Sequence, residues 1–109
     1  MTEQVLEKPA REYNNEGQQR ILELARLLAG NEFAGLTNVE IAKAMGISAP
    51  MVHRDLWNLE KAGYAEQIPE TGRWRLGPRL MQIATAFSVH VNRQRAVIDQ
   101  IEQRYTRQP

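Results

Sequence analysis

Apolar residues follow a helical period most clearly in Leu36–Gly63, where the pattern predicts two helices around a short turn. Thr37 is a good N-cap, and Glu40 stands three residues later, which is the spacing of a capping box. The apolar side of this first helix consists of Ile41, Ala42 and Met45. Gly46 is expected to end the helix, because the chain needs a left-handed residue there.

The second half of the segment predicts a longer helix. Ser48 caps its start, Pro50 is tolerated in its first turn, and Gly63 closes it. The residues expected to face the core are spaced four and three apart: Val52, Leu56 and Leu59. A capped helix, a glycine turn of about four residues and a longer capped helix together predict a helix-turn-helix.

An amphipathic segment before the helix-turn-helix predicts another helix over about Glu16–Ala29, capped by Asn15 or Asn14. Its apolar stripe consists of Ile21, Leu24, Ala25 and Leu28. The loop that follows contains Phe33, which we expect to pack against the edge of the core. Gly35-Leu36 is expected to add a very short strand.

After the helix-turn-helix the period changes to two, which predicts a β-hairpin. Its strands are expected at Tyr64–Ile68 and Arg73–Leu76, joined by the turn Pro69-Glu70-Thr71-Gly72. Trp74 and Leu76 share the face expected to join the core, and Arg73 and Arg75 share the other. A hairpin in this place is the wing of a winged helix.

A last helix is predicted from about Pro78 to Tyr105. Its apolar seam alternates spacings of four and three over more than three heptads: Leu80, Ala84, Phe87, Val91, Gln94, Ile98, Ile101 and Tyr105. We expect the domain to cover the first turns, and a second copy of the chain to cover the later ones. Gln94 is a polar residue that can fix the register. The alternative is a helix folded back onto its own domain.

The pattern therefore predicts a mainly α fold with a small β-hairpin, that is, a winged helix-turn-helix followed by a long C-terminal helix. Residues 1–14 are expected to be a flexible polar tail, 15–77 the winged helix-turn-helix domain, and 78–109 a dimerisation element.

Composition and charge narrow the classes of function only slightly. The net charge is +1, so a nucleic-acid binder would have to gather its positive charge on one face. The sequence contains no cysteine, no cluster of metal ligands, no paired-carboxylate motif and no phosphate-binding glycine loop. It therefore gives no reason to expect an enzyme, a cofactor or a metal. A secretory signal and an apolar run of the roughly 20 residues a membrane span needs are both missing. We therefore expect a cytoplasmic protein.

From Leu36 to Leu80 the sequence contains LTNVEIAKAMGIS, then VHRDLWNLEKAGY, and finally PETGRWRLGPRL. In this order and spacing the three motifs resemble the DNA-binding domain of IclR-type transcriptional regulators. The resemblance implies a DNA-binding regulator of transcription.

Such regulators continue into an effector-binding domain, whereas this sequence stops at Pro109. It is either a fragment or a DNA-binding protein without a small-molecule effector, and we expect no effector. A second difference is Ala49-Pro50-Met51, where the family often has small hydroxylated or basic residues. These residues are expected to alter the sequence preference.

In a helix-turn-helix the second helix enters the major groove with its N-terminal end deepest. Arg54 is the best candidate to read a base, through guanine O6 and N7. Its alternatives are a phosphate contact or a pair with Asn58 or Glu60. Asn58 is expected to contact adenine or phosphate, and Met51 a thymine methyl group or the core.

The remaining candidates are expected to contact the DNA backbone. Ser48 and Thr37 combine a capping role with a possible phosphate contact, and His53 can bond phosphate or nearby backbone. On the wing, Arg73 is expected to reach the minor groove, with Arg75 beside it. The full set of expected DNA contacts is Thr37, Ser48, Ala49, Pro50, Met51, His53, Arg54, Asn58, Arg73 and Arg75.

Two classes of function remain. The first is a sequence-specific regulator of double-stranded DNA, a repressor that acts as a homodimer. The second is a winged-helix module for protein–protein interaction or assembly, which the near-neutral charge supports.

Overall fold

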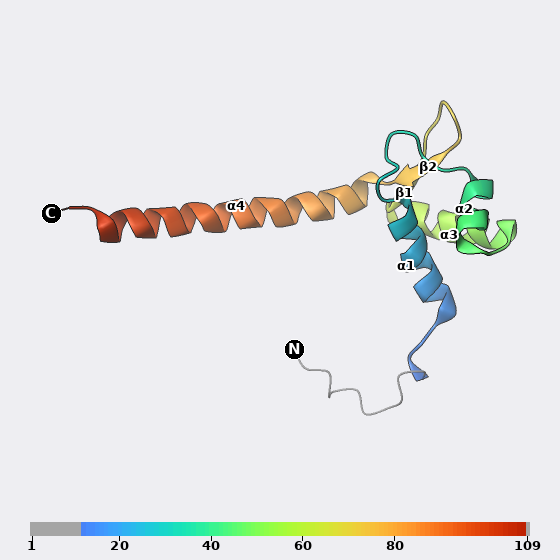
Figure 1. Cartoon of the computed structure of the whole chain (residues 1–109), viewed down its shortest axis with the longest axis horizontal. Coiled ribbons are helices and arrows are strands. Elements are labelled where there is room, and N and C mark those ends of the chain that lie inside the picture. Colours follow the sequence, from blue (N-terminus) through green and yellow to red (C-terminus); the bar gives the residue numbers. More distant parts are fainter. Residues whose placement is uncertain (1–11, 109) are drawn as a thin grey trace.

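The computed structural model describes residues 12–108, which form a small helical domain and one long projecting helix. The domain contains three helices and a two-stranded antiparallel sheet, and the fourth helix extends far from it (Figure 1). This is the winged helix-turn-helix with a long C-terminal helix that the sequence predicts. The expected tail over 1–14 lies outside the described residues except for its last three positions.

The three domain helices begin at the predicted caps, and α2 and α3 end at the predicted glycines, whereas α1 ends at Leu28 with Ala29 as its C-cap. Helix α1 spans Glu16–Leu28, and the Asn15 side chain accepts a hydrogen bond from the Gln18 amide. Helices α2, Asn38–Met45, and α3, Ala49–Ala62, form the helix-turn-helix. Between them Gly46 has φ of +68°, which a residue with a Cβ atom rarely adopts. The turn therefore depends on this glycine.

The wing is shorter than expected, although its pairing is the predicted one. Strand β1 spans Ala65–Gln67 and strand β2 spans Trp74–Leu76. Single hydrogen bonds extend the ladder at both ends, from Ile68 N–H to Arg73 O and from Gly77 N–H to Tyr64 O. The expected short strand is confirmed as one bridge between Leu36 and Trp74.

The core lies where the helices and the wing meet. It consists of the predicted apolar faces, with Trp74 from the wing closing one side. Its members are Leu24, Leu28, Ile41, Val52, Leu56, Leu59, Ala65 and Trp74. Because each helix of the domain and the wing contribute to this one cluster, packing fixes the position of α3 relative to the wing.

Helix α4, Pro78–Thr106, leaves the domain at a close contact between two glycines. A Cβ atom on Gly77 would lie 2.4 Å from the Gly63 carbonyl oxygen and 2.8 Å from the Ala65 nitrogen. The same Gly63 oxygen accepts a hydrogen bond from the Arg79 amide at 3.0 Å, which satisfies one free amide of the first turn. The chain can approach the domain this closely only because residue 77 has no side chain.

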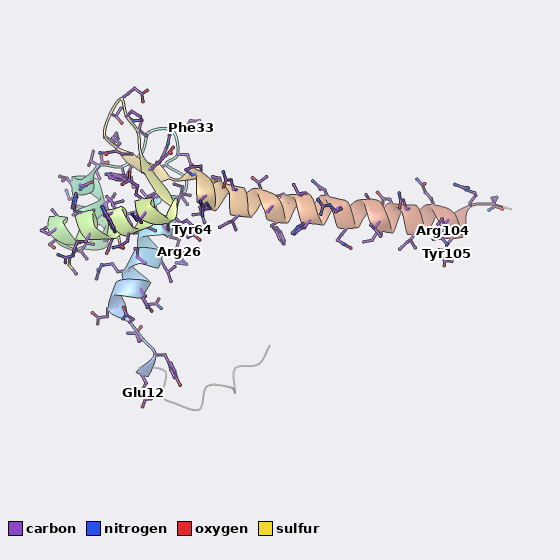
Figure 2. All side chains as sticks on the ribbon, turned by 180° about the vertical axis from the view of Figure 1, so that it is seen from behind. Glu12, Arg26, Phe33, Tyr64, Arg104 and Tyr105 are labelled. Carbon is purple, nitrogen blue, oxygen red and sulfur yellow. The ribbon has the colours of Figure 1, made fainter. Side chains whose placement is uncertain are left out.

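Two expectations about burial are wrong. Phe33 is 98% exposed, because its loop closes on itself through a hydrogen bond from the Gly35 amide to Asn31 O and places Phe33 at the tip (Figure 2). The domain does not cover the first turns of α4, since Leu80 is half-buried there and Met81 and Ile83 are exposed. The alternative in which α4 folds back onto its own domain is also wrong, because the helix projects away (Figure 1).

Candidate nucleic-acid interface

Helix α3 turns its predicted outer face to solvent. Its inner side is fixed by Val52, Leu56 and Leu59, which are at most 5% exposed. The exposed residues are Ala49, Pro50, His53, Arg54, Trp57, Asn58, Glu60, Lys61 and Ala62. Met51 is half-buried, between the two roles expected for it. The exposed face therefore mixes polar and apolar side chains, with Arg54 near its middle and the opposite charges Glu60 and Lys61 near its C-terminal end.

Arg54 is exposed, and within residues 12–108 its guanidinium has no hydrogen-bond or ion-pair partner. The Asn58 side-chain amide donates to the Arg54 backbone oxygen at 2.9 Å, so it does not hold the Arg54 side chain. The expected alternative, an intrahelical pair, is thus absent from this structure. All five guanidinium donors of Arg54 remain available to a ligand.

The N-terminus of α3 is capped by Ser48. Its Oγ accepts the Met51 amide at 3.3 Å, which leaves the hydroxyl proton free to be donated. The Lys61 ammonium lies 5.5 Å from the centre of the Trp57 ring, and Trp57 is 54% exposed. This cation–π contact orients Lys61 along the helix rather than away from it.

A half-buried ion pair positions α3 against α1, and our sequence analysis did not find it. Arg20 donates to Asp55 through Nε at 2.6 Å and through Nη2 at 3.1 Å. Asp55 is 5% exposed, and this hydrogen bonding raises the pKa of the Arg20 guanidinium. The available signal was an aspartate at the edge of the Val52-Leu56 stripe, where a charge without a partner would be costly.

Thr37, Glu40 and Arg73 form a second cluster, which links α2 to the wing. Thr37 and Glu40 bond reciprocally, amide to carboxylate and amide to hydroxyl, both at 3.0 Å. The backbone hydrogen bond from Thr37 is the main cause that lowers the pKa of Glu40, and Arg73 adds to it. The Thr37 amide is therefore occupied by the Glu40 carboxylate, while the Thr37 hydroxyl accepts a hydrogen bond from the Glu40 amide.

Arg73 does not project from the wing as expected. Its Nη2 lies 2.8 Å from Glu40 Oε1, and its Nε donates to the carbonyl oxygens of Ala34 and Gly35. Arg75 pairs with Glu66 across the hairpin at 2.7 Å. Both wing arginines are thus neutralised within the domain. Glu66 stands directly opposite Arg75 in the hairpin, whereas Glu40 is 33 positions from Arg73 and no local pattern reveals it.

At the tip of the wing, the Gln67 side chain donates to Gly72 O at 2.8 Å and closes the turn. The exposed tip carries Glu70 and no basic residue. Of the arginines predicted to contact DNA, the structure leaves only Arg54 without an intramolecular partner among the described residues.

No helix within residues 12–108 has the length and apolar character that crossing a membrane would require.

Residues 19–69 match a protein-family model described as the IclR helix-turn-helix domain. The glycerol operon regulatory protein of Streptomyces coelicolor is 34% identical over 87 residues, which cover 78% of this chain and 34% of the relative. This chain thus spans about a third of the length of that relative.

Solved structures agree with the family match. An IclR family transcriptional regulator from Brucella abortus superposes with a TM-score of 0.60 at 28% identity, over 75% of this chain and 30% of the other. A transcriptional regulator from Alicyclobacillus acidocaldarius gives a TM-score of 0.61 at 25% identity, over 67% and 29% respectively.

Proposed function

Residues 19–69 form a helix-turn-helix domain of the IclR family of transcriptional regulators, and from this premise we propose that the protein binds specific sequences in double-stranded DNA. It would act as a repressor, by occupying sites that the transcription machinery needs. The proposal takes 15–77 as the DNA-binding unit and 78–109 as the dimerisation element. The curated relative and the two solved relatives are named as regulators, which supports the class.

The observation that carries the proposal is Arg54 on the outer face of α3. The rest of the domain uses its core and the Arg20–Asp55 pair to hold this helix, while the Arg54 guanidinium has no partner among residues 12–108. Bidentate contact with guanine needs a planar donor fork of this kind. We assign base contact to Arg54, adenine or phosphate contact to Asn58, contact with a thymine methyl group to Met51, and phosphate contact to His53.

Contacts to the DNA backbone are assigned to the Ser48 hydroxyl and to Thr37 at the start of α2, while Ala49 and Pro50 at the start of α3 are placed nearest the bases. Arg73 and Arg75 belong to the same surface, but each would have to leave its carboxylate partner to reach a phosphate. In this proposal the wing contributes less to affinity than the recognition helix, because an existing ion pair offsets each new contact.

The test is a selection of duplex DNA from a random-sequence library with the purified full chain. The proposal expects an enriched motif, and affinity for it that falls steeply as salt rises. Recovery of no motif, together with salt-independent or absent binding to duplex DNA, would refute the proposal.

The second candidate is a module for protein–protein interaction or assembly. It is favoured by one observation, the neutralisation of both wing arginines by Glu40 and Glu66. A domain of this kind would lack the steep salt dependence that phosphate contacts produce. The same titration therefore separates the two candidates.

A further inference from the structure

Beyond the domain, the seam of α4 has no cover within the described chain. Phe87 is 69% exposed, Ile98 59% and Ile101 47%, on a helix that extends away from the rest of the molecule (Figure 1). Figure 2 places Tyr105 near the far end, well away from Phe33 on the domain. An apolar stripe of this length is typical of an interaction surface rather than of a solvated helix.

We propose that this seam pairs with the α4 helix of a second copy in antiparallel orientation, about a two-fold axis between Asn92 and Arg93. The proposal rests on the proposed dimer and adds its geometry. When two copies run in opposite directions about this point, residues equally far from it on either side lie at the same level. Every seam residue then meets another seam residue, in the layers Leu80–Tyr105, Ala84–Ile101, Phe87–Ile98 and Val91–Gln94, each formed twice.

The sizes of the seam residues favour this orientation over a parallel one. A parallel pair would place Ala84 opposite Ala84 and Phe87 opposite Phe87, which leaves one layer underfilled and crowds the next. The antiparallel pair combines Ala84 with Ile101 and Phe87 with Ile98, so the volume per layer is more even. Even filling matters because cavities and overpacking both destabilise an interface.

Gln94 restricts the register. In the proposed pair the two Gln94 amides lie in neighbouring layers next to the two-fold axis, where each can bond the other. Sliding one helix by a heptad in either direction reduces the number of matched layers, and in one direction places Gln94 opposite Ala84. A single polar residue in a seam is a known means of fixing register.

The seam is large enough for a specific interface. The six layers from Ala84 to Ile101 lie beyond the domain and bury six side chains from each copy. At roughly 100 Å² for each buried side chain, they reach about the 1,000 Å² that a specific interface requires. The pairing also places the two domains at opposite ends of a helix about 43 Å long, which is more than one turn of DNA. Half-sites are then expected more than one helical turn, that is, more than roughly 10 base pairs, apart.

The chain has no cysteine, so engineered disulfides can report the orientation directly. The variants are Ala84→Cys and Ile101→Cys, which lie at the same level only in the antiparallel pair. Both variants are made in the full chain. Each is oxidised alone and in a one-to-one mixture with the other, in the absence of DNA. The control pair is Gln82→Cys with Gln103→Cys, at matching levels but on the outer side of the helix. Circular dichroism checks that each variant is folded.

The proposal expects cross-links in the Ala84→Cys and Ile101→Cys mixture and none in either variant alone or in the control mixture. Cross-links within each single variant would establish a parallel pair and overturn the proposal. Absence of cross-links, with a light-scattering mass equal to one chain, would overturn the pairing itself. Since DNA is absent, none of these outcomes depends on whether the protein binds DNA, which the selection experiment tests separately.

Discussion

The Arg20 guanidinium and the Asp55 carboxylate join α1 to α3 by two hydrogen bonds, Nε to Oδ2 at 2.6 Å and Nη2 to Oδ1 at 3.1 Å. Asp55 stands directly after Arg54 in the sequence, so one residue anchors the helix inward while its neighbour faces outward. The rigidity of the proposed reading surface thus depends on an ion pair behind it.

Arg20→Ala is expected to lower the melting temperature by several degrees, because it leaves a buried carboxylate without its partner. The double variant Arg20→Ala/Asp55→Ala should recover part of the loss, since no unpaired charge remains. Arg26→Ala is the matched control on the same helix, as its pair with Glu23 is 3.5 Å long and exposed. Thermal unfolding followed by circular dichroism measures all three. Equal effects of Arg20→Ala and Arg26→Ala would contradict this role.

Arg54→Ala is expected to weaken binding to the selected DNA about tenfold or more and to relax the preference at one base position. The reason is the loss of a bidentate contact, which discriminates bases as well as adding affinity. Fluorescence anisotropy with the selected duplex and single-base variants measures both effects. Arg26→Ala removes the same charge from α1 and should leave the base preference unchanged. A uniform loss across all duplexes would assign Arg54 to phosphate instead.

Glu40→Gln is expected to increase affinity for random duplex DNA a few-fold and to steepen the salt dependence by about one unit of slope. The substitution releases Arg73 from its partner while glutamine still completes the capping box with Thr37. Salt titrations of binding give the slope. Glu23→Gln makes the same change of charge on α1 as a control. Weaker binding by Glu40→Gln would mean that the pair positions the wing for DNA and does not restrain it.

The same substitution has a pH signature. The folded state lowers the pKa of Glu40 from its ordinary value of 4.5, so its ionised form stabilises the fold. That contribution is complete above the ordinary pKa and is lost as the pH falls through the lowered one. Glu40→Gln should therefore melt below the unmodified protein at pH 7, and the gap should close as the pH falls below the ordinary pKa of 4.5 and through the lowered one. A gap that stays constant between pH 7 and pH 3 would exclude this origin.

Much of the fold follows from local sequence signals. The capping box at Thr37, the left-handed Gly46 and the period-two residues around Trp74 each act within a few positions, and all three are confirmed. The fold of the domain was predictable because such local preferences agree with the apolar pattern.

What the sequence did not reveal depends on distant partners. Arg20 and Asp55 are 35 positions apart, and Arg73 and Glu40 are 33 apart, so no periodic pattern connects them. Phe33 was misplaced because an apolar residue in a loop suggests burial, while the backbone bond of its loop turns it outward. The DNA contacts remain predictions, since they concern a ligand rather than the chain.

The contact between Gly77 and Gly63 fixes the angle at which α4 leaves the domain. Helix α4 is about 43 Å long, so a tilt of roughly 10° at its start displaces its far end by about 7 Å, close to the rise of two base pairs. In the proposed dimer, the direction in which α4 leaves the domain determines the spacing between the α3 helices of the two copies. A methyl group added at Gly77 would then change which operator spacings the protein accepts without altering any group that reads a base.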